Sequence, residues 1–341
     1  MSKLVLDSIV VVLLSYGGFK VFARFNFPAP KVFGPMLFVL VGNLMGLNFQ
    51  LPDIFNTVLT IGVGIIVGLQ FHVKIDRKLI GLLVFSCCWM IFTGLGIGKI
   101  LTLLGVQKDI ALFSAMPGGI TELTFISSMM VSDPFVVALL HATRMITLLI
   151  AVPAIVSKFP KGEAPIADSK KELDAERKPL LWYDWPVLVL LAAIAGIGLT
   201  FLHVPVGAFI GSLVATALYS IKRRGVSLAM NPHVRDVLET CVGGVVGTKM
   251  TLASVKMIPS LLIPILVLDG LILGSSLLLG KVLNHISDMD KPTSYLASAP
   301  GGFSPFVIIA GQMNANTSRV AVFHLCRYLS MIIFALIQFF L

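Results

Sequence analysis

The chain has 341 residues, of which 57% are hydrophobic and 13% charged, and its mean hydropathy is +0.95. An ordinary soluble domain is excluded, because such domains carry about 25% charged residues. The formal net charge of +9 does not indicate a nucleic-acid partner, because the basic residues lie in short connections between apolar runs, as at the cytoplasmic face of a membrane protein. We therefore expect an all-α, polytopic protein of the lipid bilayer.

Apolar runs of about 20 residues recur along the chain, and each is long enough for a helix to cross the hydrocarbon core. The N-terminal run lacks a small-residue cleavage site, so it is interpreted as a first span and not as a signal peptide. In the first half we predict helices over 4–22, 33–49, 54–72, 79–104 and 134–157, with a broken element over 110–131.

A polar stretch over 158–184 separates this half from a second one and is interpreted as a cytoplasmic linker. The second half predicts helices over 185–202, 205–221, 236–255, 257–283 and 319–341, with a broken element over 294–314. The order of elements is the same in both halves, which indicates an internal duplication. We therefore divide the chain into two membrane repeats, 1–157 and 185–341.

Each half contains a Pro-Gly-Gly motif, followed by a histidine and an arginine in a later apolar run. The motif residues are Pro117, Gly118, Gly119, His141 and Arg144 in the first half, and Pro300, Gly301, Gly302, His324 and Arg327 in the second. The spacing is constant, since 300 − 117, 324 − 141 and 327 − 144 all equal 183. Two glycine pairs, Gly64/Gly68 and Gly243/Gly247, also repeat and indicate close helix packing.

The distribution of basic loops favours one topology. If both Pro-Gly-Gly elements cross fully, there are twelve crossings, and the loop at Lys74 lies opposite the linker and the loop at Lys222, against the positive-inside rule. If each element enters and leaves on one side, there are about ten crossings and every basic loop is cytoplasmic. We prefer the second topology. Five crossings per half invert the second repeat, as in secondary transporters, and the two motifs are then approached from opposite faces.

Proline removes a backbone donor and glycine removes side-chain cover, so each motif frees backbone groups at membrane depth. Such groups are tolerated where they are buried in protein or line a wet cavity. A half-helix that starts after Gly119 would direct its positive N-terminus into that cavity, with Thr121 near the cap, and would favour an anion. Ser304 is the corresponding residue of the second half. The alternative is a kink that neighbouring helices satisfy.

The histidine and arginine of each half are three residues apart and share a helix face, in mid-span, where a charge is costly unless it is paired or hydrated. In one interpretation each arginine forms a structural bridge, for instance to Glu122. In the other, two arginines and two half-helix ends form an anion site, with the histidines as coupled proton sites. Glu122 has Pro305 as its counterpart, so it is a candidate counter-ion or proton carrier in the first half alone.

Lys249 and Asp269 are secondary candidates, because both are ionisable residues within apolar runs. They could form a structural pair, or Asp269 could be a proton site. The four cysteines lie within apolar runs without metal-type spacing and are interpreted as small buried hydrophobes. We find no catalytic or nucleotide-binding motif, so we expect no enzyme, no cofactor and no metal.

The segments Met116–Leu123 and Ala299–Gly302, within the duplicated arrangement, resemble the AbrB-duplication membrane family, which also circulates under an ammonia monooxygenase label. The resemblance covers about 10–341. It implies a panel of helices beside a core with two interrupted elements, as in inverted-repeat transporters related to sodium/proton antiporters and bile-acid symporters. The AbrB label is shared with an unrelated soluble DNA-binding regulator, whose polar, β-rich character this sequence lacks. The monooxygenase label implies a metal site for which the sequence offers no ligand set.

The sequence thus predicts a bacterial inner-membrane secondary transporter that moves a small anionic solute by alternating access, with proton coupling as an option. Its expected partners are the bilayer and a small-molecule or ion substrate, with no nucleic acid, and a homo-oligomer is left open. Two alternatives are a membrane-embedded regulator or sensor that binds a small ligand, and a membrane monooxygenase.

Overall fold

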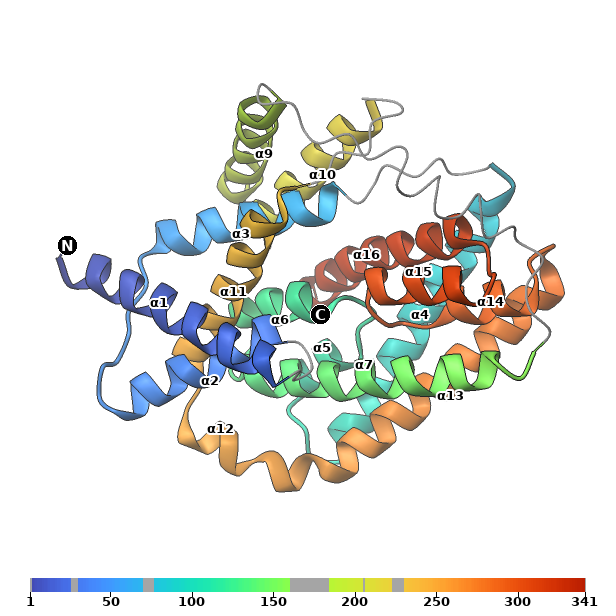
Figure 1. The fold of residues 1–341 in the computed structure, drawn as a ribbon, viewed down its shortest axis with the longest axis horizontal. Coiled ribbons are helices and arrows are strands. Elements are labelled where there is room, and N and C mark those ends of the chain that lie inside the picture. The colour runs from blue at the N-terminus through green and yellow to red at the C-terminus, as the bar shows by residue number, and fades with distance from the viewer. Residues whose placement is uncertain are drawn as a thin grey trace. The chain divides into compact units, whose positions relative to one another are not determined.

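A computed structural model describes residues 2–25, 30–69, 77–159, 184–204, 206–222 and 230–340. Within these ranges all regular secondary structure is helical (Figure 1), which confirms the all-α prediction. Most of the predicted linker, residues 160–183, lies outside the described residues.

The helices of the first half follow the predicted order, and the broken element consists of two short helices. Their bounds are α1 Ser2–Arg24, α2 Pro30–Leu44, α3 Asp53–Gly68, α4 Arg77–Leu103, α5 Lys108–Ala115, α6 Ile120–Met130 and α7 Pro134–Val156.

The second half repeats this order, with one additional short helix and a 3₁₀ turn η1 (Ile258–Leu261) before its fourth long element. Its helices are α9 Asp184–Phe201, α10 Gly207–Lys222, α11 Pro232–Lys249, α12 Leu252–Lys256, α13 Leu262–Ile286, α14 Lys291–Ser298, α15 Phe303–Gln312 and α16 Thr317–Phe340.

Five helices among the described residues are long and apolar enough to cross a membrane: α1, α4, α7, α9 and α13. The shorter helices α2, α3 and α10 are also apolar. Large hydrophobic side chains, such as Phe92, Leu190 and Leu266, point away from the protein and would meet hydrocarbon. The protein is a polytopic membrane protein.

Two predicted helices end earlier than the hydrophobic pattern indicated. The first, α2, ends at Leu44 and not at residue 49, because Gly46 takes a φ of +90° that a right-handed helix cannot contain. The second, α11, ends at Lys249, where the Asn43 amide donates to the Gly247 and Thr248 carbonyls. A capping box at Thr251 then starts α12 as a separate helix.

The chain forms two compact units, each drawn from both halves of the sequence. Unit 1 comprises Met1–His72, Thr121–Leu139 and Lys178–Pro259. Unit 2 comprises Val73–Ile120, Leu140–Arg177 and Ser260–Leu341. The broken element of the first half is therefore shared: α5 and the Pro-Gly-Gly segment belong to unit 2, and α6 belongs to unit 1 from Thr121 onward.

In unit 1, helices of the first half pack on helices of the second half at the glycine pairs. α3 packs on α10, and α11 packs on α2, while α1 pairs with α2 and α9 with α10. A Cβ added to Gly68 would lie 2.7 Å from the Leu213 carbonyl oxygen, and one added to Gly247 would lie 2.8 Å from the Met36 carbonyl oxygen. The backbones of these helices thus approach closely, as small residues allow in a membrane.

In unit 2 the two halves also contribute matched pairs: α4 packs on α5, and α13 on α14. The long helices α4 and α13 pack against one another, and α16 packs against α4, α14 and α15. This packing surrounds the two Pro-Gly-Gly segments with helices from both halves.

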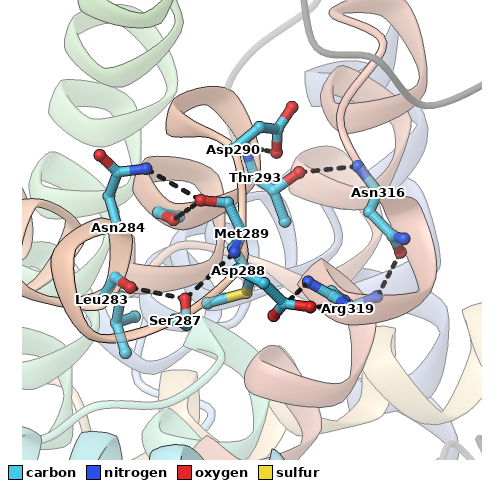
Figure 2. A network of polar contacts seen from close by, with 10 residues as sticks. Leu283, Asn284, Ser287, Asp288, Met289, Asp290, Thr293, Asn316 and Arg319 are labelled. Carbon is cyan, nitrogen blue, oxygen red and sulfur yellow. Dashed lines mark hydrogen bonds and ion pairs between the residues drawn. The ribbon is translucent and has the colours of Figure 1, made fainter.

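A network of hydrogen bonds and an ion pair holds the N-terminal end of α14, the end opposite its Pro-Gly-Gly segment (Figure 2). Asp290 caps the helix by accepting from the Thr293 backbone N–H, and the Thr293 hydroxyl accepts from the Asn316 N–H at 2.8 Å. Arg319 at the start of α16 donates to both carboxylate oxygens of Asp288 at 3.2 Å. The network joins the start of α14 to the start of α16.

Candidate functional site

The two Pro-Gly-Gly segments break their helices at equivalent points. α5 ends at Ala115 and is followed by Met116 in an extended conformation (φ −61°, ψ 142°), and α6 starts after Gly119. α14 ends at Ser298, Ala299 is likewise extended (φ −70°, ψ 120°), and Gly302 precedes α15. Each break leaves the last carbonyls of a short helix without partners in that helix.

Arg144 on α7 supplies partners for the first break. Its Nη1 donates to the Met116 carbonyl at 2.6 Å and to the Ser114 carbonyl at 3.4 Å, and its Nη2 donates to the Gly118 carbonyl at 3.2 Å. The guanidinium lies at the negative C-terminal end of α5, where a cation is favourable. Arg144 is 2% exposed. Part of its role is therefore to donate hydrogen bonds to the backbone carbonyls that have no helical partner at the Pro-Gly-Gly break.

Arg327 on α16 makes the equivalent contact in the second half. Its Nη1 donates to the Ala299 carbonyl at 3.0 Å, and its Nη2 donates to His324 Nδ1 at 2.7 Å. Because a guanidinium cannot accept a hydrogen bond, Nδ1 is the acceptor, and the Nε2–H of His324 donates to the Leu296 carbonyl at 2.9 Å. These two bonds hold His324 as a neutral imidazole.

A cavity of about 30 Å³ lies in unit 2 where the two breaks meet, which is room for about two water molecules. It is partly open and is lined by α4, α13, the ends of α5 and α14, and Arg144. The lining residues are Trp89, Met90, Thr93, Gly94, Ile97, Ala115, Pro117, Arg144, Ile272, Ser275, Ser276, Leu279, Ser298 and Pro300.

Twelve of these fourteen residues form pairs at the repeat offset. On α4 and α13 the offset is 182 (272 − 90, 275 − 93, 276 − 94 and 279 − 97), and at the breaks it is 183 (298 − 115 and 300 − 117). The cavity is thus built by equivalent residues of the two halves. Trp89 and Arg144 are the unmatched members, and both come from the first half.

Sequence reasoning placed Pro117, Pro300 and Arg144 here but missed the contribution of α4 and α13. The signal was present, because the hydroxyl-bearing Thr93 and Ser275 recur at nearly the same offset as the motifs. Small polar residues within long apolar runs look like ordinary helix contacts unless the two halves are aligned.

Two polar atoms of cavity-lining residues are buried without a hydrogen-bond partner in the described part of the chain: Ser276 Oγ and Arg144 Nε. Ser276 is 3% exposed. Buried polar groups are rarely left unpaired, and each costs about 1–3 kcal/mol when it is. Both atoms are buried, so a solute could reach this donor and this hydroxyl only after the surrounding side chains have moved.

Asp269 on α13 lies close to this cavity, one helical turn before Ile272. Its Oδ2 accepts from the Thr147 hydroxyl at 2.8 Å, and within the described residues its Oδ1 has no hydrogen-bond partner. Asp269 and Arg144 attract one another, whereas the hydrogen bonds of Arg144 go to backbone carbonyls. Arg327 is near enough to repel Arg144.

The remaining predicted residues lie elsewhere. Thr121 and Glu122 are on α6 in unit 1, where Glu122 is buried. Lys249, also in unit 1, donates to the Ser128 carbonyl near the end of α6. His141 is buried on α7 one turn before Arg144.

In the second break, Gly301 leaves space for the ring of Phe306, which lies 5.3 Å from the His324 ring between centroids. Gly302 caps α15. Ser304 belongs to α15, and its side chain lies outside the described residues. Among the side chains that the structure describes, no three of His, Cys, Asp or Glu gather as a metal site would require.

Comparison with known proteins identifies the family. Three overlapping segments, 2–159, 74–224 and 210–341, match the family described as transition state regulatory protein AbrB. The chain belongs to the AbrB family. The first and third matches fall on the two halves, in line with the duplicated order of helices in this AbrB protein.

One relative is the protein named "Uncharacterized protein YhjN" of Bacillus subtilis (strain 168), which is 22% identical over 230 residues. The match covers 63% of this chain and 59% of the relative. The chain therefore matches less than two thirds of the length of that relative.

Proposed function

We propose that this AbrB protein is a secondary transporter of the inner membrane that moves a small anionic solute through the cavity between its two Pro-Gly-Gly segments. The observation that carries the proposal is the cavity itself. It is lined by equivalent residues of both halves and by Arg144, whose buried Nε has no hydrogen-bond partner in the described residues. No covalent chemistry is needed, so we propose no enzymatic activity.

Three physical arguments support a transport function. A ligand site at a break in the helices, on the axis that relates two repeats, can be exposed to either side by rocking one element against another. Broken helices leave backbone groups that can bind a solute without much rearrangement. The cavity is partly open and has room for about two water molecules, so a larger solute requires it to widen, which a rocking motion would allow.

The anionic character follows from charge. Arg144 lines the cavity, and Arg327 lies near enough to add its positive potential. A buried positive charge attracts an anion strongly because little water screens it.

The proposal is tested by binding and by uptake. Purified protein is screened by thermal shift with formate, acetate, glycolate and nitrate as potassium salts at constant ionic strength. Ser276→Val fills part of the cavity and removes its hydroxyl, whereas Ser157→Val makes the same change at an exposed position. We expect at least one anion to stabilise wild type and Ser157→Val, and to lose most of this effect with Ser276→Val.

Uptake is then measured in proteoliposomes with the radiolabelled form of the stabilising anion. Wild type and Ser157→Val should accumulate it above empty liposomes, and Ser276→Val should be impaired at least about tenfold. Binding without uptake would favour a ligand sensor over a transporter. Equal stabilisation of all three proteins by every anion would exclude the cavity as the site.

A further inference from the structure

Trp89 on α4 has the largest side chain among the described residues that line the cavity. At the repeat offset its counterpart on α13 is Leu271 (271 − 89 = 182). Leu271 is 38% exposed and lies outside the described lining. Because most of the lining is built by equivalent residues of the two halves, the indole is bulk that the first half adds to a nearly symmetric wall.

The indole of Trp89 is held by side chains on two helices. Its Nε1–H donates to the Ser275 hydroxyl at 3.0 Å, and Ser275 lies on α13 and lines the same cavity. The Phe85 ring, one helical turn earlier on α4, packs against the indole with 6.0 Å between ring centroids and a tilt of 48° between the ring planes. An indole N–H that is removed from water usually keeps a hydrogen-bond partner. The bond to Ser275 therefore opposes rotation of the indole away from the cavity.

The hydroxyl that corresponds to Ser275 in the first half is used differently. Thr93 on α4 (275 − 182 = 93) donates to carbonyls of its own helix, at 2.8 Å to Trp89 and at 3.2 Å to Met90. Such bonds within one helix are ordinary for threonine. The bond from Trp89 to Ser275 joins two helices instead, so the duplication does not account for it.

The lining of the cavity divides by chemistry. Arg144 lies on the side formed by the ends of α5 and α14. The large apolar side chains come from α4 and α13: Trp89, Met90, Ile97, Ile272 and Leu279. A carboxylate is therefore expected to place its oxygens toward the guanidinium and its hydrocarbon chain along α4 and α13. The indole lies on the side toward which that chain would lengthen.

We propose that Trp89 sets the upper size of the solute, with Ser275 as its positioning residue, so that the site takes formate and acetate and rejects longer carboxylates. The cavity has room for about two water molecules, which leaves little space for further methylenes beside the indole. A methylene that an apolar pocket does not accommodate changes binding by about 10–200-fold. The inference rests on the anion site proposed above and specifies the class of its substrate.

The test compares formate, acetate, propionate and butyrate, as potassium salts at constant ionic strength, in binding to the purified full-length protein. Binding constants are measured by titration calorimetry, with Ser276→Val as the control for salt effects outside the cavity. Wild type should prefer acetate over butyrate by at least about tenfold. Trp89→Leu installs the residue of the other half and should reduce this preference by at least about tenfold, through a gain in butyrate affinity. Trp89→Phe should lie between the two.

The matched controls separate the bulk of the indole from its hydrogen bond. Leu271→Ala shortens the counterpart of Trp89 outside the lining and should keep the wild-type preference. Ser275→Ala keeps the indole but removes its acceptor, so the preference for acetate should weaken. Ser275→Thr retains a hydroxyl, as Thr93 has in the other half, and should keep more of the preference than Ser275→Ala.

Trp89 also provides an optical signal. The chain has three tryptophans, and replacement of Trp182 and Trp185 by phenylalanine leaves Trp89 as the emitter. If this protein binds acetate by calorimetry, the binding should change the intensity or wavelength of the emission, because the solute enters the space that the indole lines. Emission that stays constant while acetate binds would place the anion away from Trp89 and contradict the inference.

The outcomes separate the two proposals. If wild type binds acetate more tightly than Ser276→Val does, but Trp89→Leu and Trp89→Phe keep the wild-type preference, the role of Trp89 is contradicted and the anion site stands. Equal affinity of wild type for acetate and butyrate has the same meaning. If Trp89→Leu does not fold, Trp89→Phe and Ser275→Ala decide the question. If no carboxylate binds wild type or Trp89→Leu more tightly than it binds Ser276→Val, the carboxylate site fails, and the size inference fails with it.

Discussion

At the scale of single residues, the arginines of the repeated motif combine two tasks. A helix that is broken by Pro-Gly-Gly inside a membrane must find donors for its last carbonyls, and water is scarce there. Arg144 donates from two of its nitrogens to three such carbonyls, and its buried Nε has no partner in the described residues. The same cation thus holds the broken backbone in place and provides positive charge.

We expect Arg144→Met to destabilise the protein by about 2–4 kcal/mol, because it leaves several buried carbonyls without donors. Arg144→Lys should lie between this variant and wild type, because an ammonium keeps the charge but cannot match the planar fork of a guanidinium. Thermal unfolding in detergent measures both.

Lys99→Met provides the control for the loss of a cation, because Lys99 is exposed on α4. It should change stability by less than about 0.5 kcal/mol. Equal unfolding temperatures for Arg144→Met and Lys99→Met would mean that the carbonyl contacts contribute little.

At the scale of elements, most helices could be predicted from the sequence, because apolar runs of membrane length leave little choice of structure. α7 was expected over 134–157 and extends from Pro134 to Val156. The positions of the two helix breaks could be predicted because proline and glycine change the backbone at their own positions in the sequence. The end of α11 could not, because it depends on Asn43, which is about 200 residues distant in sequence.

The candidate site could likewise be predicted only in part. The motif residues were found from their repeated spacing, but the cavity walls depend on the pairing of α4 with α13, which no local pattern specifies. The sequence did not decide the partners of Arg144 for the same reason. A bridge to Glu122 and hydrogen bonds to backbone carbonyls are equally compatible with a buried arginine. Only packing decides between them.

The close packing at the glycine pairs predicts how glycine-to-alanine substitutions change stability. Gly68→Ala and Gly247→Ala should each destabilise unit 1 by about 1–3 kcal/mol, because the added methyl would press on the carbonyl of a facing helix. Gly270→Ala on α13 has open space around it and should be neutral or stabilise by up to about 1 kcal/mol.

Thermal unfolding of the three variants in the same detergent provides the comparison. If Gly68→Ala is as stable as Gly270→Ala, the close approach of α3 and α10 does not contribute to the stability of unit 1.

At the scale of the whole molecule, the number of crossings per half decides whether the repeats are inverted, and that remains a prediction. Ile54 at the start of α3 and His233 at the start of α11 are exposed and equivalent in the two repeats (233 − 54 = 179). Five crossings per half place them on opposite faces of the membrane, whereas six place them on the same face.

Single cysteines at these two positions, in a background without the four natural ones, allow the test. With a membrane-impermeant maleimide, Ile54→Cys should be labelled in intact cells, and His233→Cys only after permeabilisation. Labelling of both from one side would exclude inverted repeats and favour the topology with twelve crossings.

The exchange of partners in unit 1 has a consequence for the origin of the chain. α3 of the first half packs on α10 of the second, and α11 packs on α2, so neither half buries its own glycine faces. A polypeptide of half this length would be incomplete alone, and a second copy would have to supply its missing partners. Fusion of two such copies into one gene would then secure an assembly that already existed. It would also free each half to diverge, as Glu122 and its counterpart Pro305 have.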